Sequence, residues 1–134
     1  MGSMTAPENS IRAQFQPDVD EFIEDLETFA TGSYLSDEDK DLWDEPFDPA
    51  ALPQLKTLLE RFLDALDALG DDPEGEQLAA VAKPFFAQLD EFNQSYADAV
   101  LEPEEKADIE SLVFRAAAAT GATDEALREL PELE

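Results

Sequence analysis

The sequence predicts an all-α protein, an antiparallel bundle of four main helices with one or two additional short helices. Apolar residues return at intervals of three and four in three long segments, and a fourth segment carries a smaller, alanine-rich face. That spacing places side chains on one face of an α-helix. No segment shows the strict alternation of apolar and polar residues that is typical of a half-buried strand. Short connections between the segments favour antiparallel neighbours.

The first main helix is expected over about 17–31, with an extra turn before Pro17 as an alternative. Pro17 fits the first turn, where its missing N–H costs nothing, and Gly32 is a typical C-terminal stop. The apolar stripe in and just before this helix is expected to face the core, and it comprises Ile11, Phe15, Val19, Phe22, Leu26 and Phe29. A short helix is expected near 37–44, after Ser36 as its N-cap.

The second main helix carries the clearest stripe of the sequence and is expected to organise the core. It begins at Pro49 or just after Pro53, and Gly70 closes it. Its stripe comprises Leu52, Leu55, Leu59, Phe62, Leu66 and Leu69. The charged residues between them are expected to stay in water, and these are Glu60, Arg61, Asp64 and Asp67.

The remaining helices follow breaks at proline and glycine. A third main helix is expected over about 74–101, with Phe85 and Phe86 both in the core. The alternative is that one of the two is covered by the 37–47 segment or forms part of a groove. Glu102-Pro103 begins a fourth, which extends to Gly121, and a final short helix follows Thr123 and ends at Pro131. Residues 1–10 are expected to form a disordered tail whose first three residues are typical of a cloning remnant, and residues 11–131 to form one domain.

The acidic composition limits the classes of partner. The chain of 134 residues holds 34 acidic and 8 basic residues, a formal net charge of −26. Nucleic acid and anionic membranes are excluded as direct partners, because both bind through clustered lysine and arginine. A basic protein partner fits the sign of this charge. The crowded carboxylates are expected to have pKa values above their usual range, because protonation relieves repulsion.

The chemistry-bearing residues indicate a protein that is not an enzyme and needs no cofactor. Histidine and cysteine are absent, which excludes the usual nucleophile systems and zinc sites. Asp37, Asp39, Asp41 and Asp48 stand at calcium-loop positions 1, 3, 5 and 12. However, Leu42 replaces the required glycine, and an acid-rich helix start explains the same residues.

The sequence therefore predicts a cytoplasmic, non-enzymatic protein, monomeric or homodimeric, that binds a basic partner protein through its negative surface. An inhibitor, an immunity-type protein and a DNA mimic are examples of this class. The partner-binding residues are predicted around two aromatic anchors, Trp43 and Phe47, with acids beside them. The alternative for these two aromatic residues is that they pack against the end of the bundle. The predicted partner-binding residues are Asp37, Asp39, Asp41, Trp43, Asp44, Glu45 and Phe47. The alternatives are an acidity that serves adaptation to salt, and a bundle that binds metal through carboxylates alone.

Overall fold

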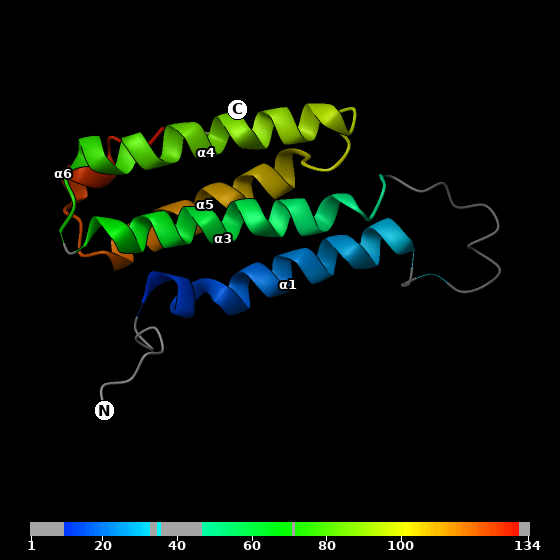
Figure 1. Cartoon of the computed structure of the whole chain (residues 1–134), viewed down its shortest axis with the longest axis horizontal. Coiled ribbons are helices and arrows are strands. Elements are labelled where there is room, and N and C mark those ends of the chain that lie inside the picture. Colours follow the sequence, from blue (N-terminus) through cyan, green and yellow to red (C-terminus); the bar gives the residue numbers. More distant parts are fainter. Residues whose placement is uncertain (1–9, 33–34, 36–46, 71, 132–134) are drawn as a thin grey trace.

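The computed structural model describes residues 10–32, 35, 47–70 and 72–131. Helices dominate this part of the chain and no strand occurs in it, so the predicted helical bundle is confirmed (Figure 1). Four helices are long and one is a single short turn. Their bounds are α1 Ile11–Thr31, α3 Ala51–Leu69, α4 Gly75–Ser95, α5 Pro103–Ala119 and α6 Asp124–Leu127. The short helix predicted near 37–44 lies outside the described residues.

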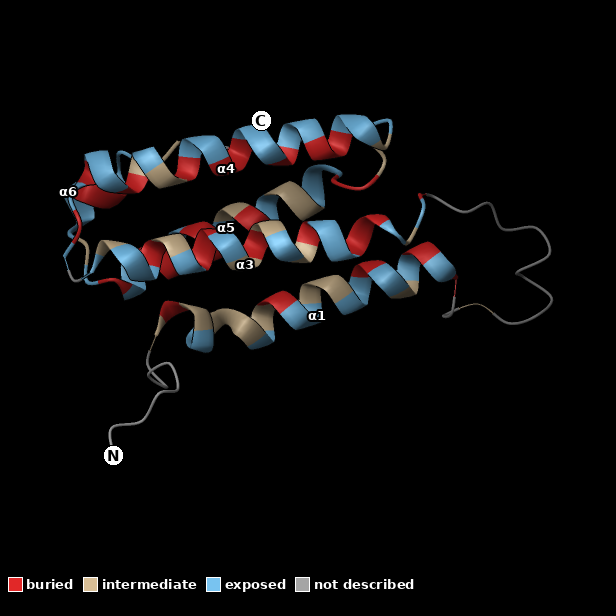
Figure 2. Cartoon of the chain, in the orientation of Figure 1, coloured by how far each residue is buried: buried red, intermediate tan, exposed pale blue. Residues whose placement is uncertain are grey.

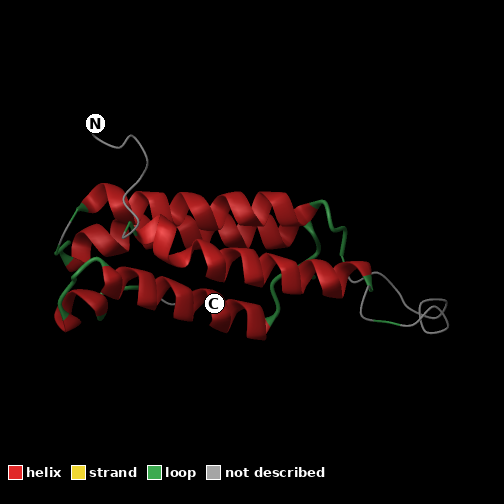
Figure 3. Cartoon of the chain, turned by 90° about the horizontal axis from the view of Figure 1, so that it is seen from below, coloured by secondary structure: helices red, strands yellow, loops and turns green. Residues whose placement is uncertain are grey.

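The four long helices run alternately in opposite directions along the length of the molecule. In Figure 1, α1 runs from left to right, α3 returns, α4 runs to the right again and α5 returns. α1 packs chiefly against α3, and α3 packs against α4, whereas α6 closes one end of the bundle against α4 and α5. The view from below shows the same elongated bundle of helices joined by loops at its ends (Figure 3).

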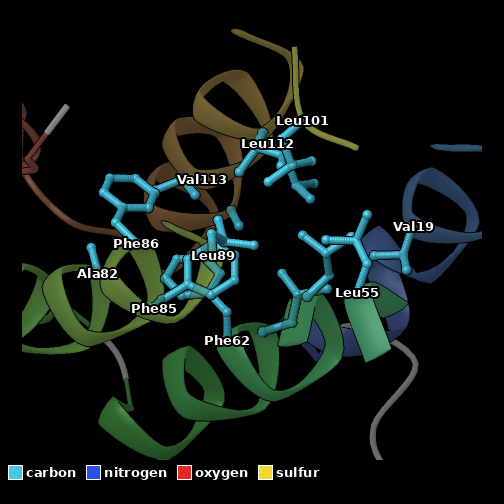
Figure 4. Packing of buried hydrophobic residues seen from close by; sticks show 14 of the residues in the cluster. Val19, Leu55, Phe62, Ala82, Phe85, Phe86, Leu89, Leu101, Leu112 and Val113 are labelled. Atoms are coloured by element: carbon cyan, nitrogen blue, oxygen red, sulfur yellow. The ribbon is translucent and has the colours of Figure 1, made fainter. Parts of the chain in front are cut away.

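The core is built around stacked phenylalanines from neighbouring helices. The rings of Phe62 on α3 and Phe85 on α4 are stacked with centroids 4.5 Å apart, and Leu89 lies beside them (Figure 4). Phe86 is also buried and points toward Val113 of α5 (Figure 4), which confirms that both adjacent phenylalanines belong to the core. Leu59 and Phe92 are buried as expected. The apolar spacing of α3 and α4 therefore identified their buried faces correctly.

The start of α1 lies earlier than predicted, because the helix begins at Ile11, more than one turn before Pro17. The Ser10 hydroxyl accepts a hydrogen bond from the Ala13 N–H at 3.0 Å. The Asp67 carboxylate, near the end of α3, accepts two more, from Ile11 N–H at 2.7 Å and from Arg12 N–H at 3.0 Å. The first N–H groups of a helix lack partners within it. Asp67, which is far from α1 in the sequence, therefore supplies hydrogen-bond acceptors for the first turn, and the local sequence around Ile11 does not indicate them.

The end of α4 also differs, because the helix stops at Ser95 and does not reach 101. Ala97 and Asp98 adopt left-handed backbone conformations, with φ of 58° and 59°. The buried Asn93 holds this turn, since its side-chain amide donates to the Leu101 carbonyl at 3.1 Å and its side-chain oxygen accepts from the Leu101 N–H at 2.9 Å. These hydrogen bonds compensate for the strain of the turn. The sequence does not indicate this turn, because neither left-handed position is a glycine.

α1 is less deeply buried than its apolar stripe predicts. Phe15 and Phe22 are only partly covered, and Phe29 is 41% exposed, so the expectation that all six stripe residues face the core is wrong for Phe29. Figure 2 shows long half-buried stretches on α1, whereas α4 has a sharply defined buried edge. The reason is that α1 packs closely on α3 but touches α5 much less, which leaves one side of its stripe uncovered.

Candidate protein-binding groove

The residues predicted to bind a partner fall mostly outside the described part of the chain. Asp37, Asp39, Asp41, Trp43, Asp44 and Glu45 lie in the segment that the structure does not describe. Phe47 is described and only 6% exposed, with its ring centroid 6.4 Å from that of Phe29. Phe47 thus belongs to the core, which fits the alternative that it packs at the end of the bundle. Whether the other six residues bind a partner stays a prediction.

Two cations hold α1 against α3. Arg12 pairs with Asp64 at 2.7 Å and with Glu60 at 3.5 Å, and Lys56 pairs with Asp20 at 3.4 Å. Gln16 links the two groups, because its amide nitrogen donates to both Glu60 and Asp20. Glu60 is half-buried in this network, so the expectation that it stays in water is wrong. Arg12 and Lys56 therefore compensate acids on the side of α1 that faces α3.

A groove runs along that other side, between α1 and α5. It consists of two adjoining hollows of about 240 and 300 Å³ that share Phe22, Asp25 and Asp108. We call it the α1–α5 groove. Its lining comprises Asp18, Glu21, Phe22, Asp25, Leu26, Phe29, Glu102, Glu104, Glu105, Asp108, Ile109, Ser111, Leu112 and Arg115.

The groove combines an apolar floor with acidic walls. Ile109 and Leu112 are buried at its base and the partly covered ring of Phe22 lies beside them. Carboxylates from both helices surround this floor, and half of the fourteen lining residues are acidic whereas one is basic. An apolar strip within a field of one sign attracts ligands of the opposite charge that also carry apolar groups.

Arg115 shows what the groove can bind, because the chain's own guanidinium occupies one end of it. Its Nη1 atom lies 3.5 Å from an Asp18 carboxylate oxygen, and its guanidinium carbon lies 5.8 Å from the centre of the Phe15 ring. A carboxylate and an aromatic face are the two surfaces that a guanidinium prefers. Arg115 is the one basic residue among the described residues that line the groove.

Two acids have pKa values that are shifted in opposite directions, Glu105 in the groove and Asp20 between α1 and α3. Burial raises the pKa of Glu105 above its usual value of 4.5, and the charges of Glu102, Glu104 and Asp108 add to this effect. The hydrogen bond from Gln16 lowers the pKa of the exposed Asp20. The expectation of raised values thus holds for Glu105, with desolvation as the larger cause, and is wrong for Asp20 because a donor is in place.

Two further properties of the described residues concern metal binding and the crossing of a membrane. No group of three or more acidic side chains among them is arranged to hold a metal ion. The helices that the structure describes are also too short or too polar to cross a bilayer. The four acids of the calcium-loop pattern include one described residue, Asp48, which caps the backbone by accepting from the Ala50 N–H at 2.9 Å.

Sequence reasoning missed this groove, although a signal for it is present. Asp18, Glu21 and Asp25 stand at intervals of three and four, and Glu104 and Asp108 are four residues apart. The acids therefore form a stripe beside the apolar stripe on each helix. The two stripes face each other because of how α1 and α5 are placed. The spacing of residues within one helix does not indicate that placement.

Comparisons with known proteins add no further information about the site. No protein family matches this chain, and no similar protein was found among curated sequences or solved structures.

Proposed function

We propose that this chain is a non-enzymatic binding protein that captures a basic partner protein in the α1–α5 groove. The observation that carries the proposal is the groove itself, an apolar floor between two acidic walls in which Arg115 already binds Asp18. The net charge of −26 speeds the approach of a cationic partner, and the apolar floor adds contact area after docking. Inhibition of the partner, as by an immunity-type protein or a DNA mimic, is the biological role that fits this class.

The experiment compares three forms of the protein as bait for basic proteins in a lysate. The first is the parent. The second is a groove variant with Glu21→Gln, Asp25→Asn and Asp108→Asn. The third is a matched control with Glu76→Gln, Asp90→Asn and Glu91→Gln, which removes the same charge from exposed positions on α4. Bound proteins are identified by mass spectrometry at about 0.1 M salt, where long-range attraction between exposed charges is partly screened.

We expect a basic protein that the parent and the α4 control both retain and the groove variant loses. Equal loss from both variants would mean that only total charge matters, and the groove would then have no particular role. Retention of the same proteins by all three forms would refute the proposal for the groove. Melting curves of the three forms show whether each remains folded.

A further inference from the structure

Two helices form the walls of the α1–α5 groove. On α1 the lining extends from Asp18 to Phe29, and on α5 it extends from Glu104 to Arg115. Each wall therefore spans eleven residue steps, about 16 Å at 1.5 Å per residue. Asp18 meets Arg115 at one end, and Phe29 shares a hollow with Glu104 at the other, as expected for antiparallel helices.

The backbone of the walls limits the form of a ligand. The N–H and C=O groups in the middle of α1 and α5 are bonded within their own helices, so they are not available to an incoming strand. An extended ligand on the apolar floor would leave its own buried backbone groups without partners. A helical ligand satisfies its backbone internally and presents only side chains to the floor.

The side chains of the groove define the ligand's charge pattern. The floor formed by Phe22, Ile109 and Leu112 accepts one apolar stripe, and acids flank it on both sides. Asp18, Glu21 and Asp25 follow the α1 wall, whereas Glu104 and Asp108 follow the α5 wall. A complementary helix therefore carries apolar residues at intervals of three and four, with basic residues on both borders of the stripe.

We infer that the occupant of the α1–α5 groove is a cationic amphipathic helix of about three turns, supplied by the partner protein. This inference rests on the proposed function and specifies the partner's binding element. The groove receives the apolar stripe of that helix, and its two acidic walls pair with the flanking arginines or lysines. Arg115 occupies a position that a guanidinium of the ligand would otherwise take, so it acts as an internal competitor at one end.

The probe is a pair of synthetic peptides of about 14 residues that contain only leucine, arginine, alanine and a fluorophore. In the first peptide the leucines follow the three-and-four spacing with arginines on both borders. In the second, with the same composition, leucine and arginine alternate, which removes the helical stripe but keeps the charge. Fluorescence anisotropy at about 0.1 M salt gives the affinities, and circular dichroism difference spectra report helix formed on binding.

Five forms of the protein separate the groove from general attraction. The groove variant and the α4 control defined above differ in charge placement but not in charge. Arg115→Gln removes the internal competitor, and Arg61→Gln removes the same charge from an exposed position on α3. The parent is the fifth form.

We expect the first peptide to bind the parent at least about 10-fold tighter than the second and to gain helix on binding. The groove variant should weaken binding by about 10-fold or more, because each exposed ion pair contributes up to about fivefold in affinity. The α4 control should change it less than about 2-fold. Arg115→Gln should tighten binding by about 2- to 5-fold, and Arg61→Gln should not.

The opposing outcomes are distinct. Equal affinity for both peptides, still weakened in the groove variant alone, overturns the helical occupant and leaves a basic partner in the groove. Equal weakening in the groove variant and the α4 control overturns both the helical occupant and the proposed function. If Arg115→Gln weakens binding, the competitor role of Arg115 is wrong.

Discussion

The buried amide of Asn93 fixes the turn that carries the chain from α4 into α5, and its removal gives a quantitative test of that role. Asn93 is 3% exposed, and both of its side-chain hydrogen bonds go to the backbone of the buried Leu101. Asn93→Ala removes both partners at once. The N–H and C=O of Leu101 then lie in the protein interior without hydrogen bonds.

The expected cost follows from these two groups. A buried backbone group that loses its partner costs about 1–3 kcal/mol. Since the turn can relax enough for water to reach one of the two groups, we expect Asn93→Ala to lower the free energy of unfolding by about 2–4 kcal/mol. For a chain of 134 residues, 1 kcal/mol corresponds to about 3–5 °C in melting temperature. Thermal unfolding followed by circular dichroism should therefore show a decrease of about 10 °C.

Asn93→Asp tests the direction in which stability changes with pH. Ionised at neutral pH, the new carboxylate can accept from Leu101 N–H but has no donor for the Leu101 carbonyl. Burial raises the pKa of such a group above its unfolded value. Its protonated form regains a donor, so stability is greatest below the unfolded pKa and is lost as pH rises through the folded pKa.

A matched control lies next to Asn93 in the sequence. Gln94 is exposed on the same helix, and Gln94→Ala should change the stability by less than about 0.5 kcal/mol. The reasoning is wrong if Asn93→Ala melts within about 2 °C of the parent. It is also wrong if the stability of Asn93→Asp shows no additional gain, relative to the parent, as the pH is lowered.

Four further predictions concern the core, the start of α1, the acidic groove and the net charge. Phe62→Ala should cost about 3–5 kcal/mol in chemical denaturation, because it removes a buried ring stacked on Phe85. Asp67→Ala should cost about 1–2 kcal/mol and increase hydrogen exchange in the first turn of α1, because two N–H groups lose their acceptor. Because the pKa of Glu105 is raised in the folded protein, its contribution to stability is largest below pH 4.5 and is lost as the pH rises through its folded pKa. Melting curves of Glu105→Gln should therefore show higher stability than the parent at neutral pH and a smaller gain on mild acidification. Added salt should also raise the melting temperature of the parent, because it screens the repulsion of a net charge of −26.

Much of the bundle could be predicted from the spacing of apolar residues. The stripe of α3 is buried where the sequence places it, except at Leu69, which is partly covered. Both phenylalanines that follow Pro84 in α4 are also buried. Such predictions succeed because burial favours whichever face of a helix carries most apolar area, and that face is a local property. The predicted helix ends failed at Ile11 and at Ser95, where residues distant along the chain or a buried amide decide the boundary.

The candidate groove could not be predicted from the sequence. Its acids are visible as stripes on two helices, but the residues predicted to bind a partner lie in a different segment, and the described one, Phe47, is buried. Asp18 and Arg115 are separated by 97 positions and still form a pair. Nothing in the spacing within either helix indicates that pairing.

The sequence by itself determined that this chain forms helices, which faces of α3 and α4 are buried, and that the surface is strongly negative. The tertiary structure alone decided that α1 packs on α3 through Arg12 and Lys56 and leaves its other side open toward α5. The physical reason is that helix formation and burial depend on neighbours three and four residues away. A groove depends on which helices meet, and contacts between distant segments decide that.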